Sequence, residues 1–169
     1  MLTDITIQGL EHICLYMRES DQREVYALRP HENWYRLAYE MHAHIKNNGR
    51  GIIAWHKGRP AGLGAFTELH PGCWEAWMIG TDDFKSVVFE LIRWGRRTAR
   101  EILQTQLGNR CQCDSHETHH EAHKLLLAMG AVPEGPPMRM YGKDGSAYQR
   151  FVWLRDNDAI LKPGFKRAL

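Results

Sequence analysis

The chain has 169 residues, a formal net charge of +2 with its histidines neutral, and 43% hydrophobic and 25% charged residues. This length fits one domain that can bury a substantial core without disulfides or metals. No apolar run approaches the ~20 residues of a membrane-spanning helix, and the small net charge argues against nucleic acid as a partner. The first residues lack the basic start of a signal peptide, so we expect a soluble protein that stays in the cytoplasm. The four cysteines are scattered along the chain, which favours reduced thiols.

Hydrophobic periodicity and capping residues predict the elements of the first half of the chain. Ser20 and Asp21 are expected to open the first helix, and Asn33 the second. Turn residues separate the strands that follow the second helix. The expected elements are a strand at 12–17, helices at 20–28 and 33–47, and strands at 51–55, 61–69 and 73–79.

The second half adds two helices and three strands. Ser115 is expected to cap the last helix and Gly130 to end it. The expected elements are a long helix at 84–106, a strand at 111–114, a helix at 115–130, and a closing hairpin of strands at 138–141 and 148–154. The fold class is therefore α/β (α+β), with a mixed, mostly antiparallel sheet of about seven strands flanked by four helices. One domain is expected over residues 1–155, followed by a C-terminal tail at 156–169.

Three stretches resemble the GNAT acyltransferase superfamily. The run NRCQCDSHETHHEAHKLLLAMGAV, residues 109–132, is similar to the last strand and helix of that fold. The stretch GIIAWHKGRPAGLGAF, residues 51–66, is typical of its second and third strands, and RESDQREVYAL, residues 18–28, is similar to its start. The resemblance implies a GNAT-like fold over about nine tenths of the chain and, if the chain is active, acetyl-CoA as the cofactor.

The stretch that would hold the cofactor diphosphate departs from the family pattern. A GNAT enzyme binds the diphosphate on a glycine-rich loop at the start of its central helix, because backbone N–H groups and the helix dipole favour anions there. Here the stretch 80–86 has no glycine after Gly80 and carries Asp82 and Asp83, which would repel a diphosphate. If the cofactor binds, the resemblance places it against Ile79, Thr81 and Lys85, with His119 at the position of the family's cofactor-binding asparagine.

The catalytic residues of the family are also incomplete. The position of its usual tyrosine acid holds Leu126, so Tyr141 or Tyr148 would have to protonate the leaving thiolate. Glu75 on the fourth expected strand is the candidate general base, and Glu68 is a second one.

A narrower resemblance connects the chain with the internal virion protein A family of short-tailed bacteriophages. It rests on the stretches GRPAGLGAF and GCWEAWMIGTDD and on the helix that ends in Gly130-Ala131-Val132. This resemblance implies a catalytically degenerate virion or assembly component, without a cofactor, that acts through protein partners in the host cytoplasm and then the virion. The alternative is an acetyl-CoA-dependent N-acetyltransferase with an atypical diphosphate loop.

Histidines follow one another at helical spacing near the last expected helix. His116 and His120 are four residues apart, as are His119 and His123, and this spacing lets two imidazoles share a zinc ion. Cys111 and Cys113 precede them, so these cysteines with His116 and His120 are a possible metal site. A half-buried flank of the helix, or a contact surface sensitive to pH, explains the same pattern. We therefore predict no metal and keep this set as an alternative.

Overall fold

The computed structural model describes residues 1–105 and 107–156. Apart from Asp156, the expected tail lies outside the described residues, as does the predicted helix end at Gln106. The elements in chain order are β1 (Leu2–Asp4), α1 (Ile7–Leu15), α2 (Glu19–Ala27), α3 (Trp34–Asn48), β2 (Gly49–His56), β3 (Arg59–His70), β4 (Gly72–Gly80), the 3₁₀ helix η1 (Asp82–Ser86), α4 (Val88–Gln104), β5 (Gly108–His116), α5 (His120–Ala128), β6 (Val132–Pro133) and β7 (Tyr148–Leu154).

The strands form one seven-stranded sheet in the order β1-β2-β3-β4-β5-β7-β6. Every neighbouring pair is antiparallel except β4 and β5, which run parallel. The crossover between these two strands is made by η1 and α4, as a parallel connection requires. The expected mixed and mostly antiparallel sheet of about seven strands is confirmed.

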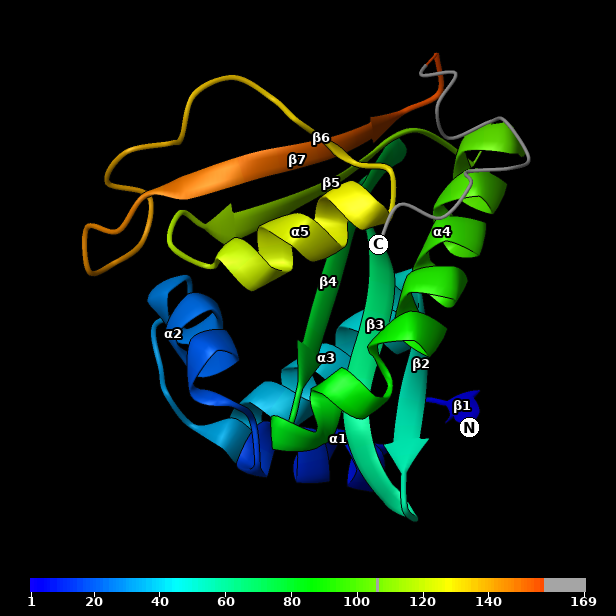
Figure 1. Cartoon of the computed structure of the whole chain (residues 1–169), viewed down its shortest axis with the longest axis vertical. Coiled ribbons are helices and arrows are strands. Elements are labelled where there is room, and N and C mark those ends of the chain that lie inside the picture. Colours follow the sequence, from blue (N-terminus) through cyan, green and yellow to red (C-terminus); the bar gives the residue numbers. More distant parts are fainter. Residues whose placement is uncertain (106, 157–169) are drawn as a thin grey trace.

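Helices cover both faces of the sheet. In Figure 1, α1 and α3 lie behind it, while α4 and α5 lie in front. The rear cluster joins apolar residues of α1 and α3 to Ile53, Leu63 and Ile79 of the sheet. The front cluster joins α4 and α5 to β3, β4, β5 and β7. None of the described helices is long and apolar enough to cross a bilayer.

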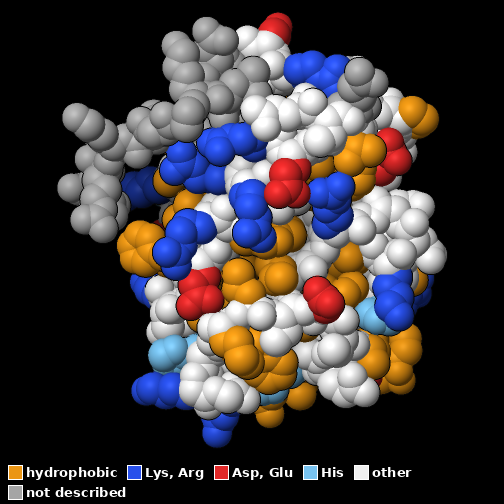
Figure 2. Space-filling view, turned by 90° about the vertical axis from the view of Figure 1, so that its right-hand side faces the viewer, with side chains coloured by type: hydrophobic (Ala, Val, Ile, Leu, Met, Phe, Trp, Pro, Cys, Tyr) orange, Lys and Arg blue, Asp and Glu red, His pale blue; other side chains and the backbone are white. Residues whose placement is uncertain are grey.

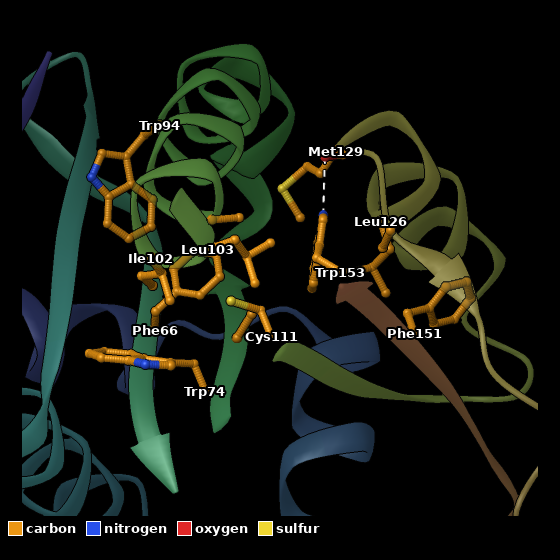
Figure 3. Packing of buried hydrophobic residues seen from close by; sticks show 13 residues of the cluster. Phe66, Trp74, Trp94, Ile102, Leu103, Cys111, Leu126, Met129, Phe151 and Trp153 are labelled. Carbon is orange, nitrogen blue, oxygen red and sulfur yellow. Dashed lines mark hydrogen bonds between the residues drawn. The ribbon is translucent and has the colours of Figure 1, made fainter. Parts of the chain in front are cut away.

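Tryptophans fill much of the front cluster. Figure 3 shows Trp94 of α4 and Trp74 of β4 on either side of Phe66, with Trp153 further along the sheet. The indole N–H of Trp153 donates to the carbonyl of Met129 at 3.1 Å, which ties β7 to the end of α5. A buried Trp needs such a partner for its one polar group. Trp74, Trp94 and Trp153 thus all belong to the buried front cluster.

The expected strand at 12–17 is wrong, because this segment belongs to α1 and the turn that follows it. Thr6 caps the helix by accepting from the N–H of Gly9 at 3.1 Å. The buried residues Leu10, Ile13, Cys14 and Met17 are spaced as i, i+3, i+4, i+7, which gives one helical stripe. The first strand is instead β1, at the edge of the sheet. The described residues thus hold five α-helices rather than the expected four.

Ser115 does not cap the last helix. It lies within β5, where its side chain is buried, and α5 begins only at His120 after a turn. The predicted closing hairpin also differs. Val132–Pro133 forms the partner strand of β7, whereas Met138 contributes only an isolated bridge to Tyr148.

Candidate functional site

The parallel strands β4 and β5 separate after four residues. Their register runs from Gly72 paired with Gly108 to Glu75 paired with Gln112, and β4 then continues to Gly80 without β5 beside it. In Figure 1 the two strands diverge, with α2 and α5 next to the opening. Among the described residues, the backbone groups of β4 on this side have no strand partner beyond Glu75. Those of Gly80 are bound by Asp21 and Arg18, so the groups between Glu75 and Gly80 are the ones available to a ligand that lies along the strand.

A cavity of about 470 Å³ occupies this opening. It passes between the strands, since residues of both faces of the sheet line it. Its rear wall comes from α2, α3 and the residues of β4 that point backward. Its front wall comes from α4, α5 and the alternate residues of the strands.

Glu75 points into the rear part of the cavity from the last paired position of β4. Among the residues that the structure describes, its carboxylate has no hydrogen-bond or ion-pair partner. Burial raises the pKa of Glu75, and the nearby Asp114 adds to the increase. An unpaired carboxylate with a raised pKa in a cavity is suited to accept a proton from a bound ligand.

Asp114 and Tyr141 lie beside Glu75 in the same wall. The Tyr141 hydroxyl donates to Oδ2 of Asp114 at 2.9 Å, and Arg150 binds both carboxylate oxygens of Asp114 at 2.7 Å each. Asp114 and Arg150 are paired residues of β5 and β7, so the register of the sheet positions this two-bond contact between guanidinium and carboxylate. Burial and the Asp114 hydrogen bond raise the pKa of Tyr141. Its hydroxyl therefore carries a proton that it can donate.

The front wall of the cavity is apolar. Trp94, Leu126 and Met129 contribute buried side chains, and Gly95 has none. A Cβ atom at Gly95 would lie 2.9 Å from the sulfur of Met129, so the absent side chain lets α4 and α5 approach. Burial raises the pKa of the Cys113 thiol in this wall. The wall therefore fits a thioester or an alkyl chain better than a charged group.

Two carboxylates of α2 hold the mouth of the cavity. Asp21 is 2% exposed; its Oδ2 accepts from Nε of Arg18 and from the N–H of Gly80, both at 2.8 Å. Glu24 accepts from Oγ of Ser115 at 3.2 Å, and its Oε2 lies 2.6 Å from Nδ1 of His119. We call these contacts of Asp21 and Glu24 the α2 clamp. It connects the far end of β4 to the far end of β5 through one helix.

Sequence reasoning did not identify the α2 clamp as part of a site. Asp21 was expected only as a helix cap, but α2 begins at Glu19 and the Asp21 side chain instead binds Arg18 and Gly80. The signal that was present is the spacing of Asp21 and Glu24, which places both carboxylates on one helix face. Asp114 and Arg29, which also line the cavity, were missed as well.

Of the four residues expected to contact the cofactor, Ile79 and His119 line the cavity. His119 precedes α5, and its side chain is 10% exposed. Its Nε2 atom is buried without a hydrogen-bond partner among the described residues, 4.0 Å from Asp21. A buried polar atom without a partner is costly, so this nitrogen is available to a ligand or to water.

Thr81 and Lys85 do not line the cavity. Thr81 uses its N–H on the carbonyl of Ala61 and its hydroxyl on the N–H of Asp83. Lys85 is largely exposed and lies 3.5 Å from Glu121. The second candidate base and the second candidate acid do not line the cavity either. Glu68 accepts a hydrogen bond from the N–H of Gly72 in a turn. Tyr148 is buried, and its hydroxyl donates to the carbonyl of Glu24.

The possible metal ligands do not converge. Across residues 1–105 and 107–156, no three His, Cys, Asp or Glu side chains form a group that could hold a metal ion. Burial raises the pKa of Cys111 to about 12, which disfavours the thiolate that zinc requires. His116 lies 3.0 Å from the hydroxyl of Thr118, and His120 is exposed beside the ring of His123.

Arginines of α4 form a basic face that does not line the cavity: Arg93, Arg96, Arg97 and Arg100. Figure 2 views the molecule from the side of α4 and β2, and Lys and Arg side chains gather there with acidic side chains among them. Glu101 lies 3.8 Å from Arg97 of the same helix and 3.2 Å from Arg50 of β2. Acidic residues therefore neutralise part of this surface.

The cavity fits one part of an acyl-CoA. The apolar front wall and the unpaired edge of β4 suit an acyl-pantetheine arm, which offers amides to a strand edge and a thioester to an apolar wall. The residues where the diphosphate of the acyl-CoA would lie fit it less well. Asp82 and Asp83 are exposed at the start of η1, and the N–H of Gly80 is already bound by Asp21.

No family model and no curated protein matches the chain in sequence. A variant of the spermidine N-acetyltransferase SpeG from Vibrio cholerae superposes with a TM-score of 0.69 at 16% identity and 96% coverage of both chains. The V. cholerae spermidine N-acetyltransferase in complex with CoA and spermine gives 0.67 at 15% identity, covering 96% of this chain and 98% of that one. A GNAT-family acetyltransferase from Bacillus anthracis gives 0.69 at 9% identity, covering 92% and 95%.

These similarities correct two expectations. The prediction of a degenerate virion component is wrong, because the neighbours that span nearly the whole chain are acetyltransferases. Nothing among them supports the resemblance to the bacteriophage virion family. The prediction of no cofactor is wrong on the same comparison, since one of these neighbours holds CoA. At identities of 9–16% the similarity shows the fold alone.

Proposed function

We propose that this chain, which has the GNAT acetyltransferase fold, transfers an acetyl group from acetyl-CoA to an amine. The observation that carries the proposal is the cavity between β4 and β5, with unpaired Glu75 in one wall and apolar side chains in the other. The neighbours with the same fold support this activity, but the residues of this cavity must perform it.

The rear wall would receive the acceptor. A protonated amine is stabilised beside the Glu75 carboxylate, which accepts one proton from it and so frees the nitrogen lone pair to attack the thioester carbon. Because burial raises the pKa of Glu75, this carboxylate is a stronger base than an exposed one. We expect kcat/KM to fall as the pH drops through this raised pKa.

The front wall would hold the donor. Acetyl-CoA supplies an activated carbonyl carbon, and the β4 edge after Glu75 supplies backbone groups that orient it. Trp94, Leu126 and Met129 exclude water from the thioester. As the C–S bond breaks, Tyr141 would give its hydroxyl proton, which it donates to Asp114 in the free protein, to the sulfur that leaves, and the second proton lost by the acceptor nitrogen would restore the hydroxyl.

The test combines binding and turnover. Calorimetry with acetyl-CoA measures donor binding, and thiol release with a panel of amines measures transfer. We expect Glu75→Gln to lower kcat/KM by about 10²- to 10⁴-fold, the usual contribution of a general base, without weakening the binding of acetyl-CoA. The matched control is Glu68→Gln, which removes a carboxylate that lies in a turn outside the cavity.

A second pair of variants tests the diphosphate end. We expect Asp82→Asn/Asp83→Asn to tighten acetyl-CoA binding several-fold, because two repelling charges are removed, and the exposed Asp144→Asn to have no effect. If the wild-type protein neither binds acetyl-CoA nor releases thiol with any amine, the proposed function is wrong.

A further inference from the structure

Most charged groups around the cavity already have partners. Asp21 is paired with Arg18, Glu24 with His119, and Asp114 with Arg150. Glu40, at the rear edge of the cavity, lies 2.7 Å from Arg36 and 3.1 Å from His31. A ligand that enters the cavity therefore meets few charges that are not already neutralised.

Arg29 is an exception. It follows α2 and is half-buried in the cavity wall, where one guanidinium N–H donates to the carbonyl of Val25 at 3.1 Å. No carboxylate within residues 1–105 and 107–156 forms an ion pair with it. A guanidinium has five N–H donors, and the bond to the end of α2 uses one of them. The remaining donors are available to an anion that occupies the cavity.

Glu75 is the second exception, and it lies in the same rear wall as Arg29. The two charges are close enough to influence each other, yet they form no direct ion pair. Both side chains line the same cavity. A positive group beside Glu75 and a negative group beside Arg29 would satisfy both residues at once.

We propose that the acceptor is a small molecule that carries both the reacting amine and an anionic group, with the amine at Glu75 and the anion at Arg29. This inference rests on the proposed function and names its substrate class. An α-amino acid has the required chemistry, because its amine and carboxylate are joined by one carbon. An acidic residue at the N-terminus of a peptide presents the same pair of groups.

Polyamines fit this arrangement poorly. Every additional ammonium group would need its own acid, but Glu40 and Asp114 are engaged by arginines. The positive charge of Arg29 would also repel a second ammonium. The volume of about 470 Å³ must hold the acyl end of the donor as well, which favours a short acceptor.

The experiment compares amino acids with the amines that remain when their carboxylate is removed, such as leucine with 3-methylbutylamine and phenylalanine with phenethylamine. Binding is measured by calorimetry without acetyl-CoA, and turnover is measured with it. We expect the amino acid of each pair to bind about 10- to 100-fold more tightly, which is the usual contribution of a charge-assisted hydrogen bond. Arg29→Gln should remove this preference and leave the binding of the amine unchanged.

Two further variants separate recognition from folding. Arg29→Lys keeps the charge and should keep part of the preference, since it loses only the planar fork. Arg23→Gln, on the exposed side of α2, is the matched control and should leave the preference unchanged. If Arg29→Gln weakens amino acid and amine equally, Arg29 serves only the end of α2 and the proposal is wrong.

The outcomes also separate this inference from the proposed function. Turnover of polyamines in preference to amino acids would leave the activity standing and overturn the acceptor class. Amino acid binding that depends on Arg29, without acetyl transfer, would support the acceptor site and overturn the activity. Peptides with an N-terminal aspartate, compared with the same peptides carrying asparagine, distinguish a peptide acceptor from a free amino acid.

Discussion

The two ends of the cavity are closed by different kinds of interaction. At one end, from Gly72 to Glu75, β4 and β5 are joined by a main-chain ladder. At the other end, Gly80 and Ser115 are not paired in the sheet, and each is bound by a carboxylate of α2. The ladder is made by main-chain groups, whereas the α2 clamp depends on the side chains of two residues. The width of the mouth is therefore set by side-chain chemistry rather than by the sheet.

The largest expected effect comes from Asp21→Ala, which breaks the clamp at β4. This change leaves Arg18 without its buried partner and the N–H of Gly80 without an acceptor. We expect the free energy of unfolding to fall by about 3–5 kcal/mol, as measured by chemical denaturation. A loss below about 1 kcal/mol would mean that the mouth is held by something else.

A smaller loss is expected from Glu24→Gln, which weakens the clamp at β5. An amide oxygen can still accept one hydrogen bond, but the charge beside His119 is lost. We expect about 1.5–3 kcal/mol of destabilisation, the range for hydrogen bonds to charged groups. The variant should also change the environment of His119, which NMR of its ring protons would report. An unchanged His119 signal would contradict the contact.

At the end closed by the ladder, a substitution of Glu75 is expected to stabilise the protein rather than destabilise it. Because burial raises the pKa of Glu75 above its ordinary 4.5, the folded protein retains a proton there that the unfolded chain has released. The free energy of unfolding therefore falls as the pH rises from the pKa of Glu75 in the unfolded chain to its raised pKa in the folded protein, and it is constant at higher pH. We expect Glu75→Gln to be more stable than the wild type at pH 7, by about 0.5–2 kcal/mol, and to lose this advantage near pH 4. Chemical denaturation of both proteins between pH 4 and pH 7 tests this prediction. A difference in the free energy of unfolding that does not change with pH would refute it.

The smallest effect is expected from Glu19→Ala, which serves as the control for the clamp. Glu19 lies on α2 as Asp21 does, but its ion pair with Arg23 is exposed. Exposed pairs of this kind contribute little, so the stability should change by less than about 0.5 kcal/mol. A loss comparable with that of Asp21→Ala would show that α2 is simply sensitive to substitution.

The sequence predicted the sheet better than the site. From residue 51 onward, alternating apolar residues and turn residues located β2, β3 and β4 within a few positions, because those patterns are local. The segment 12–17 was misassigned since its β-branched and aromatic residues resemble a strand, although the spacing from Leu10 to Met17 is helical.

The site depended on contacts between distant residues. Asp21 binds Gly80, 59 positions away, and Glu24 binds Ser115, 91 positions away. Neither contact leaves a periodic signal in the sequence. Glu75 and Tyr141 were found because the family resemblance suggested their roles, and the structure places both in the cavity wall. Their assignment as base and acid stays a prediction.

Cys113 lies in the front wall of the cavity, and its thiol is kept protonated by the burial that raises its pKa. A thiol in this state reacts slowly with alkylating reagents until the surrounding structure opens. The side chains of Cys14, Cys73 and Cys111 are buried in the two halves of the core. Cys113 is only partly buried and packs against the front cluster, so the rate of its alkylation, measured by mass spectrometry on the unmodified protein, reports how readily the front wall of the cavity opens.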